Sequence, residues 1–92
     1  QRVRYYLGLS HAKAGNDDLA IQQLREIPAD SEMFPQAATY LAFLLRRQER
    51  LDEAIDHVET AADRNPDDAD LAALLASLHY DAGNSRKAIE LM

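Results

Sequence analysis

Three histidines are the residues whose chemistry could support acid–base catalysis or metal binding in this chain of 92 residues. His11 and His79 open two similar stretches, HAKAGNDDLA and HYDAGNSRKA. His57 stands four residues after Glu53, a spacing that places both on one helix face and would make half of a metal site. No third ligand is apparent in the sequence. We therefore expect packing or solvated histidines and no metal site.

The other residue types that enzymes use are not arranged for catalysis. The chain has no Cys, which excludes disulfides and thiolate metal sites. The serines lie in no nucleophile-elbow context, and the three isolated glycines form no phosphate-binding loop. The carboxylates are dispersed, as on a solvated surface. We expect no enzymatic activity and no cofactor.

One fixed period organises the chain. The two similar stretches begin at His11 and His79, and a third copy, LRRQERLDEA, stands midway between them at 45–54. The copies therefore span 1–34, 35–68 and, incompletely, 69–92, as one array. The recurring columns are Leu7, Leu41 and Leu75; Gly8, Ala42 and Ala76; Ala20, Ala54 and Ala88; Ile21, Ile55 and Ile89; and Leu24, Val58 and Met92.

Apolar residues recur at helical spacing inside each copy, and the alternation typical of strands is absent. Each copy therefore reads as a helix, a tight turn and a second helix. The small residues in the columns of Gly8 and Ala20 suit places where two helices approach closely. We expect helices over 2–14, 17–27, 35–48, 52–64, 69–82 and 85–92.

The turns and helix ends carry their own signals. Gly15 and Gly83 suit the left-handed conformation that ends a helix, whereas the middle copy has Glu49 there. That turn either closes differently or bears a strain of about 1 kcal/mol. The remaining end signals are Pro28 as a stop, Pro35 in a first turn, Asp67 or Asp68 as a cap, and Ser85 as the last cap.

These columns resemble the tetratricopeptide repeat, a helix–turn–helix motif that recurs about every 34 residues. The resemblance covers the whole chain and implies an all-α fold, a right-handed α–α superhelix (solenoid) of antiparallel helix pairs with about 2.7 repeats. The early aromatic of the motif is missing, because Arg4, Ala38 and Ala72 stand there. The matching residues are Leu7-Gly8, Gly15, Ala20 and Leu24; Leu41-Ala42, Ala54, Val58, Ala61 and Pro66; and Leu75-Ala76, Gly83, Ala88 and Met92.

The resemblance implies that the first helix of each copy lines a concave groove, which would hold a peptide or helix of a partner protein. All four tyrosines of the chain fall in these columns, and Tyr is favoured at binding surfaces. Packing between copies, or cover by a neighbouring helix, is the alternative explanation for these rings. The groove residues we expect are Tyr5, Tyr6, Leu9, Lys13, Tyr40, Phe43, Arg46, Arg47 and Tyr80.

Charge on the expected groove is uneven. Lys13, Arg46 and Arg47 would form a basic rim, against Asp70 and Asp81 in the third copy. A ligand with an acidic end and apolar anchors would suit that rim, although scattered solvated charge is an equal alternative. The chaperone-binding subtype is not expected, because its carboxylate clamp of Lys, Asn and Arg is not matched. The corresponding positions here are Tyr5, Leu9, Tyr40, Asp70 and Leu74.

Composition limits the partners. A net charge of −6 argues against nucleic acid, and no apolar run approaches the roughly 20 residues of a membrane span. Localisation stays open between cytoplasm and periplasm, and the Ala- and Leu-rich composition looks bacterial.

Ile89 and Met92 would lie on an uncapped end. The chain is therefore expected to be a fragment of a longer protein, and the alternative function is a scaffold segment that self-associates or packs against further repeats.

Overall fold

The computed structural model describes residues 2–83, which contain five α-helices and no strand. The expected helices agree with the observed ones to within two residues at every end. The expected helix over 85–92, with Ser85 as its cap, lies outside the described residues. The observed helices are α1 (Arg2–Lys13), α2 (Asp17–Arg25), α3 (Phe34–Arg47), α4 (Leu51–Arg64) and α5 (Ala69–Asp81).

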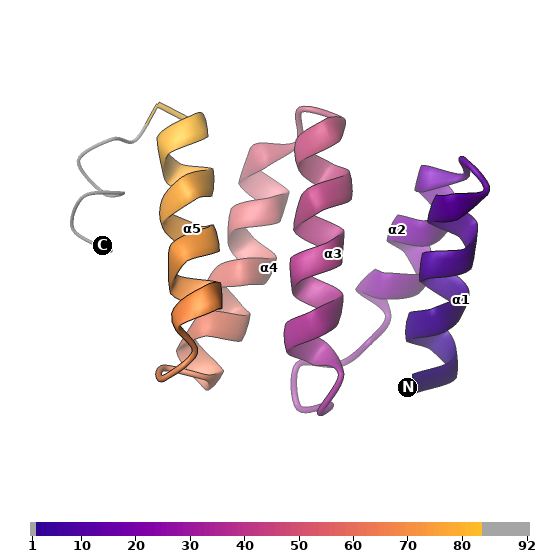
Figure 1. The fold of residues 1–92 in the computed structure, drawn as a ribbon, viewed down its shortest axis with the longest axis horizontal. Helices are drawn as coiled ribbons and strands as arrows, with labels where there is room; N and C mark the ends of the chain where they lie inside the picture. The colour runs from indigo at the N-terminus through magenta and orange to yellow at the C-terminus, as the bar shows by residue number, and fades with distance from the viewer. Residues whose placement is uncertain (1, 84–92) are drawn as a thin grey trace.

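The helices form two layers. In Figure 1, α1, α3 and α5 stand side by side in the nearer layer, and α2 and α4 lie behind them. Consecutive helices run antiparallel, so each of the first two repeats is a helical hairpin, and the first helix of every repeat belongs to the nearer layer. We call the surface formed by α1, α3 and α5 the first-helix face. The all-α, repeated-hairpin architecture expected from the repeat period is confirmed.

The turn inside each repeat uses a left-handed residue. Gly15 and Gly83 both have φ +84°, and Glu49 has φ +61° at the corresponding position. Glu49 is the one residue other than glycine with positive φ within residues 2–83. Of the two possibilities for the middle turn, the structure shows the second: the same turn forms and the backbone bears the strain.

Hydrogen bonds confirm that the first two turns are the same. The Asn16 N–H donates to the His11 carbonyl at 2.8 Å, and the Arg50 N–H donates to the Leu45 carbonyl at 2.8 Å. Both bonds span five residues and satisfy carbonyls at a helix end, as in a Schellman motif. The similar stretches that begin at His11 and Leu45 therefore each contain a helix C-terminus and the turn that follows it.

The ends of the remaining helices follow the expected signals. Helix α2 ends before Pro28, and Pro35 lies in the first turn of α3. Asp68 caps α5, because its Oδ1 accepts hydrogen bonds from the N–H groups of Asp70 at 3.0 Å and Leu71 at 3.2 Å. Asp68, rather than Asp67, is thus the cap.

Small residues lie where the helices of a repeat cross. A Cβ atom added to Gly8 on α1 would lie 2.9 Å from the Leu24 side chain on α2. In the second repeat, Ala42 on α3 holds the column of Gly8 and Ala54 on α4 holds the column of Ala20, and both are fully buried. Close approach at this crossing is therefore the reason for the small residues, as expected. Ala88, in the third copy, lies outside the described residues.

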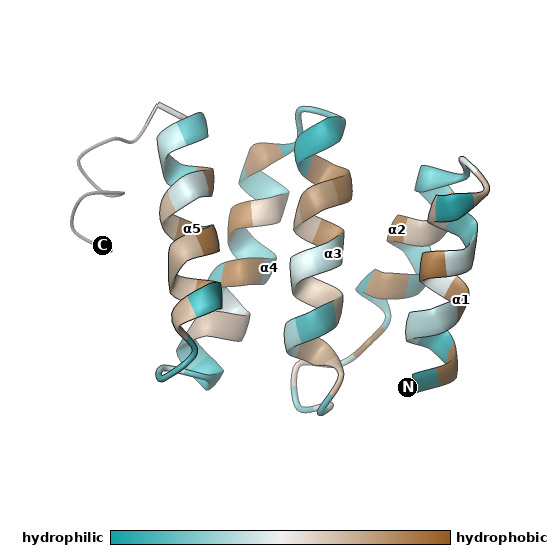
Figure 2. Ribbon diagram, in the orientation of Figure 1, coloured by the Kyte–Doolittle hydropathy of each residue, from teal (hydrophilic) through white to brown (hydrophobic). Residues whose placement is uncertain are grey.

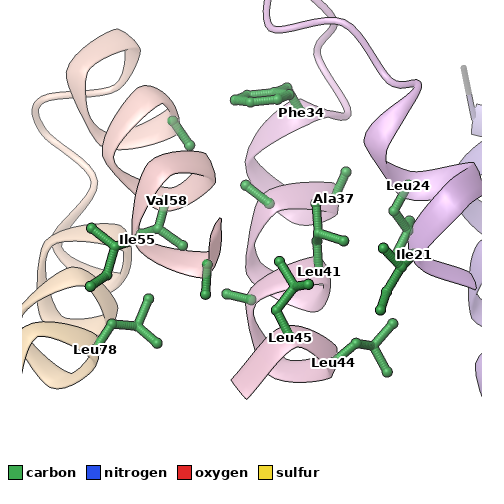
Figure 3. Close-up of a cluster of buried hydrophobic side chains, with 14 of the residues drawn as sticks. Ile21, Leu24, Phe34, Ala37, Leu41, Leu44, Leu45, Ile55, Val58 and Leu78 are labelled. Carbon is green, nitrogen blue, oxygen red and sulfur yellow. The ribbon is translucent and has the colours of Figure 1, made fainter. Parts of the chain in front are cut away.

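The hydrophobic core is continuous across the repeats and centres on α3. In Figure 2 the turns that join α3 to α4 and α4 to α5 are hydrophilic, and a brown hydrophobic stretch occupies much of the upper half of α3. Figure 3 shows side chains of α3 between those of α2 on one side and those of α4 and α5 on the other. The labelled members of this cluster are Ile21, Leu24, Phe34, Ala37, Leu41, Leu44, Leu45, Ile55, Val58 and Leu78.

Candidate functional site

The first-helix face holds a pocket of about 320 Å³ where α1, α3 and α5 all begin. Residues from all three repeats line it, so no single repeat could form it. We call it the first-helix pocket. Its lining residues are Tyr5 from α1; Pro35, Gln36, Thr39 and Tyr40 from α3; and Asp68, Asp70 and Leu71 from the start of α5.

Aromatic rings form one side of the face. Tyr5 and Tyr40 are partly buried, and each lies beside a more exposed ring of its own helix. The centroids of Tyr5 and Tyr6 are 5.3 Å apart in an edge-on arrangement, and those of Tyr40 and Phe43 are 6.1 Å apart. Contacts of this kind between aromatic rings are favourable beyond the area that they bury.

Burial raises the pKa of the Tyr5 hydroxyl above its usual value of 10, and the nearby Tyr6 and Tyr40 hydroxyls add to the rise. The hydroxyl of Tyr5 therefore stays protonated at neutral pH. A neutral phenol offers one hydrogen-bond donor and an acceptor beside an apolar ring. The pocket thus combines apolar area with a polar group at its edge.

Carboxylates form the opposite side of the pocket. Asp68 uses Oδ1 to cap α5, and Asp70 is exposed. No Lys or Arg lines the pocket, and neither aspartate belongs to an ion pair within residues 2–83. This side of the pocket therefore carries negative charge that no described cation offsets.

Arg46 is held by α5 at the other end of the face. Its Nη2 donates to Ser77 Oγ at 3.1 Å, and its Nε lies 3.2 Å from Asp81 Oδ2. The sequence suggests that Asp81 opposes the basic rim across the groove. In the structure the two charges instead form one ion pair that joins α3 to α5.

Arg47 reaches the other layer of helices. Its Nη2 donates to both carboxylate oxygens of Asp17 at 2.8 Å, and its guanidinium carbon lies 5.4 Å from the Phe43 ring centroid. Two of the three expected rim cations are thus compensated by carboxylates of this chain. The expected basic rim is therefore partly neutralised within the chain, and Lys13 remains as an exposed cation of α1.

The nine expected groove residues separate into two groups. Tyr5 and Tyr40 line the first-helix pocket, and Tyr6 and Phe43 contact those two rings. The other five do not line it: Leu9, Lys13, Arg46, Arg47 and Tyr80. Tyr80 is 68% exposed, so its ring is not packed against the other described helices.

Six lining residues are not among the nine expected groove residues: Pro35, Gln36, Thr39, Asp68, Asp70 and Leu71. The sequence marks Pro35 and Asp68 only as helix-start signals, and it does not place Leu71 on the face. These residues share a position at or near the start of a first helix. Because the three first helices lie side by side, their N-terminal turns lie close together. That alignment follows from the repeat period and could have been used to find them.

The histidines lie apart from the pocket. His79 is buried, with both ring nitrogens lacking a hydrogen-bond partner among the described residues, and His11 is partly buried. Burial lowers the pKa of His57, Arg25 lowers it further, and Asp56 and Glu53 partly offset this. Within residues 2–83, no three His, Cys, Asp or Glu side chains gather as a metal site would require.

Across residues 2–83, none of the helices has the length and apolar character that crossing a membrane would require.

Comparison with known proteins identifies the family. A search of curated proteins found no match. Two family models described as tetratricopeptide repeat match the chain, one over residues 45–92 and one over residues 2–30. The first match alone covers more than half of the chain, and the helical hairpins repeat at the matching period, so the chain belongs to the tetratricopeptide repeat family.

Proposed function

We propose that this chain is a protein-interaction module that binds a peptide or helical segment of a partner on the first-helix face. The observation that carries the proposal is the first-helix pocket, which three successive repeats build together. Tyr5 and Tyr40 would pack against partner side chains there, because tyrosine buries a large area at little cost in side-chain entropy. Family membership supports the proposal, since tetratricopeptide repeats generally mediate protein–protein interaction or assembly.

Peptides selected from a display library against the chain would test this function. Their affinity for the wild type and for the double variant Tyr40→Ala/Phe43→Ala is then measured by fluorescence polarisation. We expect binding about tenfold or more weaker in the variant, because rings at the centre of an interface carry much of its binding energy.

Leu19→Ala serves as the matched control, since Leu19 is an exposed apolar residue of α2, outside the first-helix face. It should leave the affinity unchanged. Circular dichroism confirms that each variant is folded. Selected peptides that bind a folded Tyr40→Ala/Phe43→Ala variant as tightly as the wild type would contradict the proposal.

Assembly is a second candidate function, favoured by apolar residues exposed at the α1 edge of the array. Val3 is 82% exposed and Leu7 is 44% exposed. Ile89 and Met92, expected at the opposite end, lie outside the described residues. Mass measured by light scattering over a range of concentrations would test this candidate. Association that Val3→Asp abolishes supports it, and a monomer at every concentration contradicts self-association.

A further inference from the structure

We propose that the first-helix pocket receives a lysine or arginine side chain of the partner segment. This inference rests on the proposed function and adds the chemistry of the residue that is recognised. It differs from the ligand with an acidic end that the expected basic rim would suit, which is one of two equal alternatives from the sequence.

The charge balance of the pocket carries the first part of the inference. Asp68 and Asp70 are the charged residues of its lining, and no cation within residues 2–83 pairs with either. Asp68 uses Oδ1 as the cap, and no hydrogen bond of the described residues involves its Oδ2. Two carboxylates beside a cavity attract a cation and repel an anion.

Helix dipoles oppose these carboxylates but do not cancel them. Helices α1, α3 and α5 all begin near the pocket, and each N-terminus acts as about +0.5 of an elementary charge. Three such ends sum to about +1.5 at most, against about −2 from the two aspartates. Asp68 also accepts two of the free N–H groups of α5, so those donors are not available to an anion.

None of the described cations of the same face lines the pocket. Arg2 and Arg4, which stand near Tyr5 on α1, lie 4.0 Å and 3.5 Å from carboxylate oxygens of Glu32 and Glu26. Arg46 and Arg47 pair with Asp81 and Asp17 near the C-terminal end of α3. Lys13 lies eight residues beyond Tyr5 on α1, about 12 Å along the helix axis. That distance exceeds the Debye length of about 8 Å at physiological ionic strength. The charged side chains that line the pocket are therefore the two aspartates alone.

The apolar part of the pocket suits the rest of a basic side chain. Lys and Arg carry three or four methylene groups below the charge, and these pack on apolar surface while the head group stays polar. Leu71 and the rings of Tyr5 and Tyr40 supply that surface. The faces of tyrosine rings also attract cations. A purely apolar residue would leave the carboxylates without a partner.

A small-molecule probe tests the pocket apart from any peptide. Nα-acetyl-arginine amide is titrated into the ¹⁵N-labelled chain and followed by NMR, with Nα-acetyl-citrulline amide as the uncharged control. We expect the arginine probe to shift the amide signals of Thr39, Tyr40 and Leu71 progressively, and the citrulline probe to shift them much less. Equal shifts with both probes, or shifts confined to other regions, would overturn the inference.

A second experiment uses matched peptides. Labelled peptides selected as above are synthesised with Lys, Arg, Gln or Glu at each position in turn, and their binding is compared. At one position we expect Lys or Arg to bind about tenfold tighter than Gln, with Glu the weakest. The preference should disappear in Asp68→Asn/Asp70→Asn, because Asn still caps a helix but carries no charge.

The control variant is Glu59→Gln/Asp63→Asn, which removes the same charge from exposed positions of α4 in the other layer. It should keep the Lys/Arg preference. Peptides that bind through Tyr40 without any basic preference would overturn the inference and leave the proposed function standing. If no peptide binds, the proposed function fails, and the NMR probe still decides the chemistry of the pocket.

Discussion

Glu49 holds the position that Gly15 and Gly83 occupy in the other repeats, and its backbone adopts the same left-handed conformation. A side chain at positive φ costs about 1 kcal/mol or more, and glycine avoids this cost. The middle turn thus forms because the helices around it impose its geometry, not because Glu49 favours it. A non-glycine residue at positive φ therefore indicates that tertiary packing, and not the residue's own preference, determines the backbone conformation there.

Glu49→Gly should raise the free energy of unfolding by about 0.5–1 kcal/mol, which is the relief of strain less the entropy cost of ordering glycine. Urea unfolding followed by circular dichroism measures the change. The matched variant Gly15→Ala should lower it by about 1 kcal/mol, because φ is +84° there while no atom lies within 4 Å of the added Cβ. A loss of stability in Glu49→Gly would show that the glutamate side chain makes a stabilising contact.

His57 should make the fold less stable in mild acid. Its pKa is lowered in the folded chain, by burial first and then by Arg25, so the unfolded chain binds its proton more readily. Stability therefore falls as the pH drops below the unfolded value of about 6.5. Urea midpoints at pH 7.5 and 5.5 should differ less in His57→Gln than in the wild type. An identical difference would contradict this assignment.

At the scale of elements, α3 connects the array. Its apolar residues contact α2 on one side and α4 on the other, and its last turn pairs with α2 through Arg47 and with α5 through Arg46. The two described hairpins have small residues at their crossings. Helix packing, rather than helix propensity alone, therefore determines where the helices lie.

Ala54→Leu should cost about 1–3 kcal/mol, because Ala54 is fully buried at the crossing of α3 and α4 and a larger side chain overpacks it. Thermal melting monitored by circular dichroism measures the loss. Glu59→Leu, an exposed change on the same helix, should remain within about 0.5 kcal/mol of the wild type. An unchanged melting temperature for Ala54→Leu would remove Ala54 from the crossing.

At the scale of the whole molecule, equivalent residues differ because their repeats have different neighbours. Leu7 and Leu41 hold one column of the repeat, yet Leu7 is 44% exposed and Leu41 only 1% exposed. Leu41 packs in the core that α3 shares with its neighbours on both sides. In an array of this kind, the stability that a residue contributes depends on the adjacent repeat.

Leu41→Ala should therefore cost about 2–5 kcal/mol, the usual loss for a buried leucine. Leu7→Ala should cost about 1 kcal/mol or less, because much of its side chain is already in water. Urea unfolding of both variants at low protein concentration measures the two losses. Equal losses would show that another surface covers the α1 edge in solution, which would favour the assembly function.

Local sequence signals are enough to specify the repeated hairpins, their helix ends and their turns. These signals are apolar spacing, capping side chains and residues tolerant of positive φ, and the repeat period makes each of them visible more than once. The family follows from the same columns. The aromatic residues Tyr5 and Tyr40 could also be placed on one face in this way.

Only the packing of the helices specifies which charges meet. Arg47 pairs with Asp17 and Arg46 with Asp81, residues far apart in the chain, and no sequence pattern identifies those partners. The same packing leaves Asp68 and Asp70 beside the aromatic rings without a cation among the described residues. A long side chain can reach several neighbours, and the position of the next helix determines which one it contacts. The tertiary structure therefore decided that the pocket is lined by carboxylates, while two of the expected rim cations are paired within the chain.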